Sequence, residues 1–564
     1  MNRIIKHPIS GGRAVVECLK AHNIKLVFGL IGSATMELFD ALYGEDAIKF
    51  IDVRDERTGT HMADAYARAS GSHGVIIAGQ NGPGATNLVT GVAQAKAAFS
   101  PLLSIAGAIS SEHQGKDAFQ EVDQQKLFEP ITKKTFSIKN TKSIPEDLNK
   151  AINLTTQGKC GPVHVNIPRN VLADVEKFDS FYIDKNEKQK IISEKDIEKI
   201  ILLIEKSSQP VIICGAGIKN SKTYKEAMSL SRKLHIPIAS SAGHGDVIPS
   251  DYELYAGQMG PRGNKVASSL VKNADLILAL GTRLGFNSTF YSYDNISQSA
   301  KIVQVDIDPI AIGRYFPIDV GINNDVKLFF ESLTSFLKNK DIKTNSRKWS
   351  EEFLNSKTLY YKKRDEDADL NSVLIQPSGL FKELRNLMPK NSSVTLDAGT
   401  LCLQATDEFN FFEPQSLFTP LDFGLVGFSF AAGLGVKLAK PDSHVFSLMG
   451  DGGFGMTISE LSTAVSHRIN TITIVMNNKS WGAEKAYQRD FYDKRYIGAD
   501  ISSPPFHELA ELYGAKGYHV TKLTNLKKAV SDALVCNKPA VINVEVDPDA
   551  LYSFRKDSFK HRTK

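Results

Sequence analysis

Two residues in the last third of the chain, Asp451 and Asn478, have the types and spacing of ligands to a hard metal ion. Asp451 stands in a Gly-Asp-Gly turn after one apolar run, and Asn478 follows the next apolar run. With a nearby backbone carbonyl, such as that of Ser480, they would provide carboxylate, amide and carbonyl oxygens, a set that suits Mg²⁺. The N–H groups of Gly452 and Gly453 at a helix start would stabilise a phosphate. The pattern therefore describes a diphosphate that is anchored through a metal ion.

The elements that must position these residues form a predicted βαβ unit. Residues 445–448 and 472–476 have the composition of buried strands, and the segment between them has helical spacing. Thr457 and Glu460 predict a capping box at the start of that helix. The carboxyl ends of parallel strands meet at one edge of a sheet, where open α/β sheets bind ligands. We therefore expect the two candidate metal ligands to lie close together.

This motif resembles the thiamine diphosphate motif of the enzyme family that includes acetolactate synthase and pyruvate decarboxylase. In that family G-D-G is followed at the end of the next strand by N-N, here Asn477 and Asn478. The resemblance extends over residues 29–168, 209–325 and 396–546. It implies thiamine diphosphate and Mg²⁺ as cofactors. It also implies a homodimer or homotetramer whose active site lies at the subunit interface.

The first part of the chain contains a candidate for the carboxylate that thiamine catalysis needs. Such a carboxylate lies against the aminopyrimidine ring and favours the imino form, which removes a proton from the reactive carbon. Glu56 precedes residues 62–68, M-A-D-A-Y-A-R, which resemble the helix that follows this glutamate in the family. Asp55 and Asp64 compete by composition, but Asp64 is expected to pair with Arg68 one helical turn later. The resemblance assigns the role to Glu56.

Four further residues correspond to positions near the cofactor in the family. Gly82 belongs to a Gly-Pro-Gly turn in which glycine lets the backbone approach a ligand. Gln120, in a Phe-Gln-Glu segment, matches a glutamine that reaches the reacting centre, and an ordinary surface loop is the alternative. Val426 matches the bulky residue that supports the bent cofactor. Thr400 matches a position that contacts the diphosphate.

Several segments resemble sulfoacetaldehyde acetyltransferases more than acetolactate synthases, namely residues 244–246, 281–284, 481–485, 488–495 and 553–557. The chain also has Ile31 where acetolactate synthases usually have proline. This likeness implies conversion of sulfoacetaldehyde and phosphate to acetyl phosphate and sulfite. Such a site must bind a small anionic substrate and phosphate, so it needs cationic donors. The candidates are His113, Lys485 and Arg489, with a solvent-facing position as the alternative for each.

Other functions are alternatives to this one. An acetolactate synthase-like carboligase or a 2-oxoacid decarboxylase, acting on pyruvate or a related oxoacid, would release CO₂ and need no phosphate. A non-catalytic paralogue is disfavoured because Glu56, Asp451 and Asn478 are all present. An NAD-dependent dehydrogenase is disfavoured because residues 215–217, Gly-Ala-Gly, lack the rest of a dinucleotide fingerprint. For the same reason we expect no required FAD, although acetolactate synthases hold one in their central domain.

These residues are distributed over three α/β segments. Strand and helix patterns alternate throughout the chain, which predicts parallel sheets. The resemblance implies three doubly wound parallel-sheet domains: an N-terminal thiamine pyrimidine-binding domain at residues 1–175, a central domain at 191–338 and a C-terminal thiamine diphosphate- and Mg²⁺-binding domain at 376–550. Lys-rich residues 176–190 predict a linker, and the charged residues 338–369 predict a connection with a solvated helix.

Length and composition agree with a large soluble enzyme. The chain has 564 residues, 42% hydrophobic and 23% charged, which is enough for several domains and excludes a disordered chain. It lacks an apolar run of membrane-span length and a signal-peptide core, so we expect a cytoplasmic protein without a membrane partner. The net charge of +5 mildly favours anionic substrates, and we find no nucleic-acid motif. Five scattered cysteines predict neither disulfides nor a zinc site.

Overall fold

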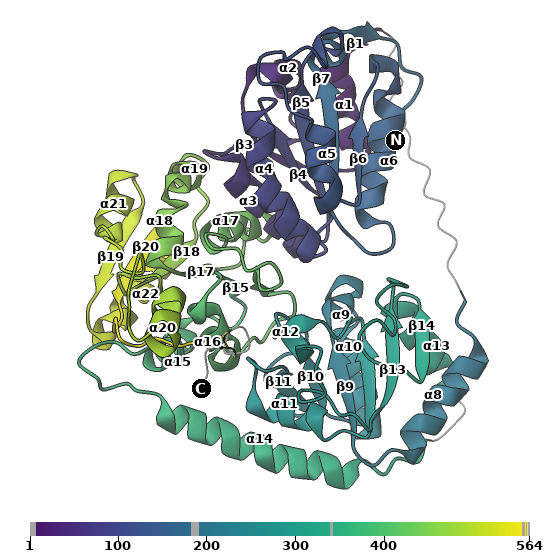
Figure 1. Ribbon diagram of the computed structural model, residues 1–564, viewed down its shortest axis with the longest axis vertical. Coiled ribbons are helices and arrows are strands. Elements are labelled where there is room, and N and C mark those ends of the chain that lie inside the picture. The colour runs from purple at the N-terminus through teal and green to yellow at the C-terminus, as the bar shows by residue number, and fades with distance from the viewer. Residues whose placement is uncertain (1–6, 182–190, 339–341, 555–558, 560, 562–564) are drawn as a thin grey trace.

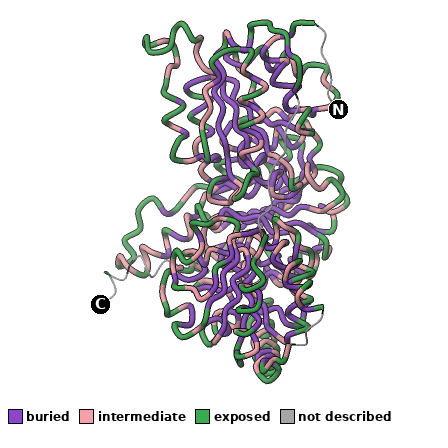
Figure 2. The backbone as a smooth tube through the Cα atoms, turned by 90° about the vertical axis from the view of Figure 1, so that its right-hand side faces the viewer, coloured by how far each residue is buried: buried purple, intermediate pink, exposed green. Residues whose placement is uncertain are grey.

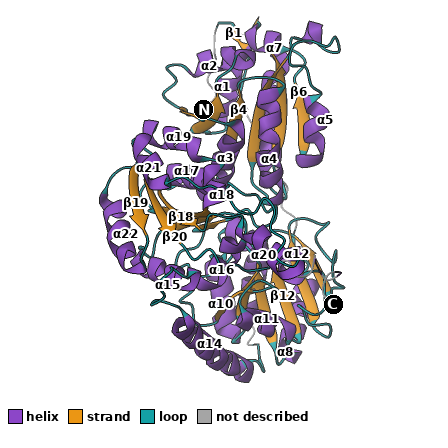
Figure 3. Ribbon diagram, turned by 60° about the vertical axis from the view of Figure 1, so that its left-hand side comes forward, coloured by secondary structure: helices purple, strands orange, loops and turns teal. Residues whose placement is uncertain are grey.

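Three parallel sheets, one in each third of the chain, dominate the computed structural model, which describes residues 7–181, 191–338, 342–554, 559 and 561. Each sheet has six strands, and every pairing within the three sheets is parallel. Helices lie on both faces of the sheets (Figure 3). The predicted α/β class with three doubly wound parallel sheets is therefore confirmed.

The N-terminal sheet has the strand order β3-β2-β4-β5-β7-β6 and lies at the top of Figure 1. Its strands are β2 (Leu26–Leu30), β3 (Lys49–Asp52), β4 (Gly74–Ala78), β5 (Leu102–Ala108), β6 (Lys134–Ser137) and β7 (Val163–Pro168). The helices of this segment are α1 (Gly11–Ala21), α2 (Met36–Leu42), α3 (Glu56–Ser70), α4 (Pro83–Ala97), α5 (Gln124–Phe128), α6 (Ile144–Thr156) and α7 (Arg169–Ala173). The short antiparallel strands β1 (Ile9–Ser10) and β8 (Val175–Glu176) pair at its two chain ends.

The middle sheet has the order β11-β10-β9-β12-β13-β14. Its strands are β9 (Pro210–Cys214), β10 (Ile238–Ser240), β11 (Tyr255–Gln258), β12 (Leu276–Leu280), β13 (Lys301–Asp306) and β14 (Val320–Asn323). The helices are α8 (Glu194–Lys206), α9 (Ala216–Ser221), α10 (Tyr224–Leu234), α11 (Lys265–Lys272), α12 (Phe286–Thr289) and α13 (Val326–Leu337). Helix α14 (Arg347–Asp367) then runs toward the third segment along the bottom of Figure 1.

The C-terminal sheet has the order β16-β15-β17-β18-β20-β19. Its strands are β15 (Ser393–Leu396), β16 (Leu417–Phe418), β17 (Val445–Gly450), β18 (Ile472–Asn477), β19 (Lys516–Val520) and β20 (Ala540–Glu545). The helices are α15 (Pro377–Leu387), α16 (Thr400–Glu408), α17 (Ser429–Ala439), α18 (Asp451–Gly455), α19 (Leu461–Ser466), α20 (Gly482–Phe491), α21 (Phe506–Leu512) and α22 (Leu526–Val535). The central strand β18 is buried along its whole length, as expected for a parallel strand covered on both faces.

The first and third segments pack against each other through helices α3 and α17. Their backbones touch, because a Cβ on Gly435 of α17 would lie 2.1 Å from the carbonyl oxygen of Met62 in α3. Met62 and Ala63 share one apolar core with residues of α17, including Phe430. These residues are buried, and Figure 2 shows buried chain through the interior of the molecule. The start of α3, which carries Glu56, is therefore held in a fixed position against the C-terminal segment.

The two predicted connections differ in how much of them the structure describes. Residues 182–190 of the expected linker at 176–190 lie outside the described residues, as do 339–341 in the second connection. Helix α14 in that second connection is buried only at Ser350 and Phe353, in agreement with the predicted solvated helix. Over the described ranges, every helix is too short or too polar to cross a lipid bilayer.

Candidate active site

Asp451 and Asn478 lie at neighbouring strand ends of the C-terminal sheet. Strands β17 and β18 are parallel and in register from Phe446 opposite Ile472 onward, so the predicted βαβ unit is confirmed. Asp451 begins α18 immediately after β17, and Asn478 follows β18 directly. Both residues line one cavity of about 470 Å³. The sequence motif therefore comes together at the edge of the sheet where α/β proteins bind ligands.

The Asp451 carboxylate has an oxygen that no neighbouring hydrogen bond satisfies. The residue is 1% exposed, and its Oδ2 accepts a hydrogen bond from Ser503 Oγ. Oδ1 is buried without a hydrogen-bond partner among the described residues. Burial raises the pKa of this carboxyl, opposed by the Ser503 contact. Because an unsatisfied buried carboxylate oxygen is costly, this atom is suited to binding a cation.

The two further candidate oxygen ligands, those of Asn478 and Ser480, lie in the turn after β18. Asn478 Oδ1 accepts from the backbone N of Ser480 at 3.2 Å, which fixes the amide at the cavity wall. Ser480 also lines the cavity, and its side chain is buried. An amide oxygen and a backbone carbonyl beside the unsatisfied Asp451 oxygen fit a hard divalent cation.

Gly452 and Gly453 pack so closely that neither position has room for a side chain. A Cβ on Gly452 would lie 2.5 Å from the Trp481 ring. A Cβ on Gly453 would lie 2.2 Å from Asp397 Oδ2. Because α18 begins at Asp451, the N–H groups of its first turn lack partners within the helix. The two glycines therefore leave donors beside the cation ligands, as a phosphate would need.

The predicted capping box of Thr457 and Glu460 is wrong. Thr457 is the N-cap residue of the short 3-10 helix Ile458–Glu460, but its side chain makes no capping hydrogen bond there. Thr457 Oγ1 instead donates to the carbonyl oxygen of Gly453 at 3.4 Å. The Glu460 carboxylate accepts from the backbone N of Arg54 at 3.0 Å and from the hydroxyl of Thr58. These two donors come from the first segment, and the hydroxyl of Thr463 also donates to this carboxylate at 2.7 Å. Together they replace the expected cap. Glu460 thus binds Arg54 and Thr58, which lie two residues before and two residues after Glu56.

Thr400 and Val426 line the same cavity from two neighbouring loops. Thr400 begins α16 after Gly399, which has a φ of 105°. Val426 lies between Gly424 and Gly427, whose φ values of 75° and 85° favour glycine. The buried Asp397 carboxylate accepts from Gly427 N at 3.0 Å and so holds the Val426 loop in place. Burial raises the pKa of Asp397 to about 6, although the backbone N–H groups of residues 427–429 oppose the shift.

Glu56 is a buried carboxylate at the first turn of α3. It is 3% exposed, and its Oε2 accepts a hydrogen bond from Asn87 Nδ2 at 3.0 Å. Burial raises its pKa, and the Asn87 contact acts in the opposite direction. The competing acids have structural contacts: Asp55 caps α3, and Asp64 pairs with Arg68 at 3.1 Å, as predicted.

The structure brings Gly82 and Gln120 together beside Glu56. Gly82 has a φ of 57°, and a Cβ there would lie 2.5 Å from the carbonyl oxygen of Gln120. That carbonyl also accepts from Asn81 Nδ2 at 2.9 Å. At the other side of the turn, a Cβ on Gly84 would lie 2.9 Å from Glu56 Oε1. The three predicted residues of the first segment therefore form one group around the Gly-Pro-Gly turn.

This group and the Asp451 cavity are separate within one chain. The described residues that line the cavity come from the middle and C-terminal segments, and the first of them is Arg262. Glu56, Gly82 and Gln120 are absent from its walls. Within a single chain, the two halves of the predicted site therefore do not line one common cavity.

The predicted cationic residues lie outside the cavity. Lys485 Nζ is bound to Asp500 Oδ1 at 2.7 Å, and Arg489 Nε is bound to Asp490 Oδ1 at 2.7 Å. His113 is exposed in a short turn. Helix α20 presents Glu484 and Tyr487 to the cavity instead. Arg262 lines the cavity from the middle segment and was not predicted, because its Gly-Pro-Arg-Gly turn carries no signal of its distant partners.

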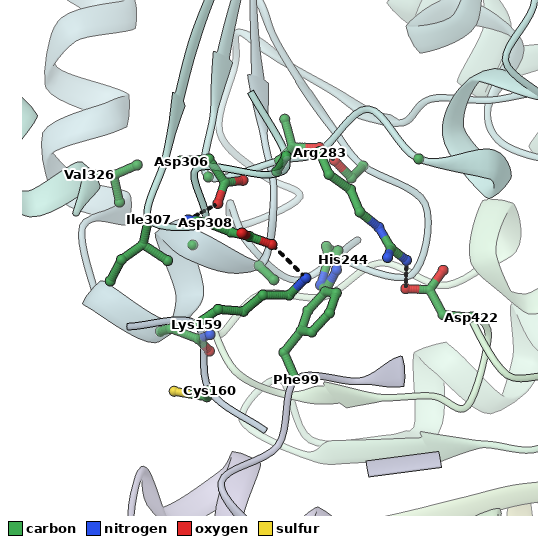
Figure 4. Close-up of a pocket in the computed structure, with 18 of the residues that line it drawn as sticks. Phe99, Lys159, Cys160, His244, Arg283, Asp306, Ile307, Asp308, Val326 and Asp422 are labelled. Carbon is green, nitrogen blue, oxygen red and sulfur yellow. Dashed lines mark hydrogen bonds and ion pairs between the residues drawn. The ribbon is translucent and has the colours of Figure 1, made fainter. Parts of the chain in front are cut away.

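A second cavity, of about 330 Å³, lies between the first and middle segments (Figure 4). Two ion pairs project into it: Lys159 with Asp308 at 2.9 Å, and Arg283 with Asp422 at 3.1 Å. Gly217 lies at its wall, and a Cβ there would be 2.6 Å from the Gly281 backbone. The glycines of the predicted 215–217 turn therefore serve close packing of one strand end against another.

Three family models match the chain, one over each sheet. They are "Thiamine pyrophosphate enzyme, N-terminal TPP binding domain" at residues 9–127, the central domain of the same enzymes at 197–333, and their C-terminal TPP binding domain at 397–544. The first and third include the Glu56 group and the Asp451 motif respectively.

Curated relatives are similar to the chain over nearly their whole length. The probable acetolactate synthase large subunit of Methanococcus aeolicus is 32% identical over 97% of this chain and 93% of its own. The sulfoacetaldehyde acetyltransferase of Alcaligenes xylosoxydans xylosoxydans is 31% identical over 98% of this chain and 95% of its own. The acetolactate synthase large subunit of Haemophilus influenzae is 30% identical over 96% of this chain and 95% of its own.

Proposed function

Because this chain belongs to the thiamine pyrophosphate enzyme family that includes acetolactate synthase large subunits and sulfoacetaldehyde acetyltransferases, we propose that it is a sulfoacetaldehyde acetyltransferase. The observation that carries the proposal is the position of residues 481–495. Residues 481–485 and 488–495 resemble those acetyltransferases, and Trp481 and Glu484 line the cavity beside Asp451. In this proposal, the part of the chain with the specific likeness would face the substrate.

An acetolactate synthase-like activity on pyruvate is the second candidate. It is favoured by the relatives, among which large subunits of acetolactate synthase are more numerous than sulfoacetaldehyde acetyltransferases. The two candidates share the cofactor and differ in the second reactant. Phosphate is consumed in the first reaction, and CO₂ is released in the second.

The residues of the C-terminal segment fit the binding of a diphosphate through Mg²⁺. Asp451 Oδ1, Asn478 Oδ1 and the Ser480 carbonyl would hold the metal ion. The N–H groups of Gly452 and Gly453 would donate to the diphosphate. Thr400 would add a hydroxyl donor from the opposite loop, and Val426 would form an apolar wall under the cofactor.

The first segment would provide the group that transfers the proton. Thiamine diphosphate, when bound, supplies a nucleophilic carbon that adds to the carbonyl group of an aldehyde or oxoacid. Glu56 would exchange a proton with a ring nitrogen of the aminopyrimidine, a role that suits a buried carboxyl whose pKa is raised. Gln120 would provide a polar contact at the reacting centre. Asn87, through its bond to Oε2, would orient the Glu56 carboxylate.

The proposed reaction is balanced without an external oxidant. The carbon–sulfur bond of sulfoacetaldehyde breaks, and sulfite leaves with the electron pair. The aldehyde carbon is oxidised to the acyl level while its neighbour is reduced to a methyl group, and a phosphate oxygen bonds to the acyl carbon. The reaction therefore needs no redox cofactor, and we propose that FAD is not required. An extended dinucleotide in the second cavity would also have to displace the ion pairs of Lys159 and Arg283 (Figure 4).

The assay that tests the function uses purified protein with thiamine diphosphate, Mg²⁺ and phosphate, and no added flavin. We expect sulfite and acetyl phosphate from sulfoacetaldehyde, and we expect sulfite release to depend on phosphate. Pyruvate is the parallel substrate, with CO₂ and acetolactate measured. Turnover of pyruvate alone would reject the acetyltransferase and support the second candidate.

We further propose that the chain acts as a homodimer or homotetramer in which one subunit provides Glu56 and its partner provides Asp451. The separation of the two groups within one chain supports this arrangement. A Glu56→Gln variant and an Asp451→Asn variant should each be inactive. After mixing, dissociation and reassociation, about a quarter of wild-type activity should return, because half of random dimers are mixed and one of their two sites is intact.

The control for this experiment is a mixture of each variant with itself, treated identically. Sedimentation before and after mixing checks that dimers have re-formed. Persistent inactivity of mixed, re-formed oligomers would show that Glu56 and Asp451 act within the same subunit.

A further inference from the structure

The cavity beside Asp451 is poor in positive charge. Of the described residues that line it, Arg262 is the one lysine, arginine or histidine. The other charged residues in its wall are acids: Asp397, Asp422, Asp451, Glu484 and Asp547. A reaction between two oxyanions in such a cavity needs a cation, since acids would repel both reactants.

The turn that carries Arg262 is built to hold it in one position. Gly260 has a φ of 117°, and a Cβ there would lie 2.6 Å from the carbonyl oxygen of Asn287. Gly263 N donates to the carbonyl oxygen of Gly260 at 2.9 Å and closes the turn. A Cβ on Gly263 would lie 2.4 Å from the Gln258 carbonyl oxygen. Both flanking glycines are therefore required by the close approach of neighbouring backbone.

Side chains on both sides of the turn attach it to the C-terminal segment. Gln258 Nε2 donates to the carbonyl oxygen of Thr406 at 3.2 Å, and Asn264 Nδ2 donates to Asp407 Oδ1 at 2.9 Å. Both acceptors belong to α16, whose first residue, Thr400, also lines the cavity. The Arg262 turn is thus fixed to the helix that faces the expected diphosphate, and little ordering remains to be done when an anion binds.

The contacts of the Arg262 guanidinium set its plane. Nη1 donates to Asn287 Oδ1 at 3.4 Å, and Nε donates to the carbonyl oxygen of Phe554 at 3.3 Å. The group also lies over the rings of Phe290 and Phe554, at 4.7 and 5.3 Å from their centroids. Apolar rings beside a guanidinium strengthen its attraction for an anion, because they exclude water.

We propose that Arg262 binds a tetrahedral oxyanion of the reactants, either the sulfonate of the aldehyde or inorganic phosphate. The inference rests on the proposed function for the identity of these anions. Arg262 takes the place that the sequence assigned to Lys485 and Arg489, which are bound to Asp500 and Asp490 outside the cavity. A planar guanidinium matches the paired oxygens of a sulfonate or phosphate.

The test compares Arg262→Gln, Arg262→Lys and the wild type in the assay with thiamine diphosphate and Mg²⁺. One KM, for sulfoacetaldehyde or for phosphate, should rise about 10- to 100-fold in Arg262→Gln, with a smaller change in kcat. The KM that rises identifies the oxyanion. The KM of Arg262→Lys should be intermediate, because lysine keeps the charge but lacks the paired donors of the planar guanidinium. The matched control is Lys265→Gln, which replaces an exposed cation at the start of α11. Both KM values of this variant should stay within about twofold of the wild type.

Quenching of tryptophan fluorescence by thiamine diphosphate checks folding, since Trp481 lines the cavity. A variant that binds the cofactor and keeps both KM values at the wild-type level would overturn the inference. So would a loss confined to kcat. If the wild type releases no sulfite, the proposed function fails, and the same variants are measured with pyruvate, whose carboxylate is also an oxyanion. A raised KM for pyruvate in Arg262→Gln then supports anion binding by Arg262, and an unchanged KM rejects it.

Discussion

Replacement of Glu56 by glutamine should lower kcat by about 10²- to 10⁴-fold, the range for loss of a proton-transfer group, while thiamine diphosphate still binds. The amide keeps the size of the side chain and an oxygen that accepts from Asn87, so the packing around α3 should remain. It cannot exchange a proton with the aminopyrimidine ring. The measurement is kcat at saturating substrate, together with the cofactor affinity from fluorescence quenching.

The matched control for this variant is Asp64→Asn, a second buried carboxylate on the same helix. Asp64 pairs with Arg68 at 3.1 Å, away from the Gly82 turn. Its replacement should lower thermal stability, because a buried ion pair loses one partner, and it should leave most of kcat. Full activity of Glu56→Gln would refute the assignment of Glu56. An equal loss of kcat in both variants would point to a structural role of α3.

Replacement of Asp451 by asparagine should remove the stabilisation that Mg²⁺ and thiamine diphosphate give to the protein. A ligand at one hundred times its Kd stabilises the folded state by about 2.7 kcal/mol, and this contribution should vanish with the metal ligand. The loss is expected because the buried Oδ1 has no hydrogen-bond partner among the described residues, and a charged oxygen there attracts a cation more strongly than a neutral amide oxygen does. Turnover should fall below detection.

The measurement is the melting temperature of wild type and variant, with and without the two cofactors. Asp490→Asn serves as control, because Asp490 binds Arg489 on α20 and lies outside the cavity wall. It should keep the cofactor-dependent rise of the wild type. An equal rise in Asp451→Asn would show that Asp451 does not hold the metal ion. The same scans without Mg²⁺ separate the metal from the diphosphate.

The fold and the central motif were predictable because they depend on short-range patterns. Strands and helices alternate along the chain, and the connection between two parallel strands has one favoured hand. Asp451 and Asn478 therefore had to meet once residues 445–448 and 472–476 were identified as neighbouring strands. The pair of Asp64 and Arg68 was predictable for the same reason, since both lie on one helix one turn apart.

The capping box failed at a point where local and distant partners compete. Thr457 and Glu460 have the correct spacing, but Glu460 accepts from Arg54 and Thr58 of the first segment as well as from the nearby Thr463. A helix cap is worth about 1 kcal/mol, and a buried carboxylate between two segments gains more from such donors than from one cap. No pattern within residues 451–466 contains that information.

The sequence by itself determined the class of fold, the thiamine motif at Asp451 and Asn478, and the candidate carboxylate Glu56, because each is written in a continuous stretch of chain. Only the tertiary structure decided which cation faces the cavity. Charge type is visible in sequence, but the direction of a side chain depends on partners far away in the chain. Asp500 and Asp490 bind Lys485 and Arg489 away from the cavity, while a glycine turn fixed to α16 places Arg262 in its wall.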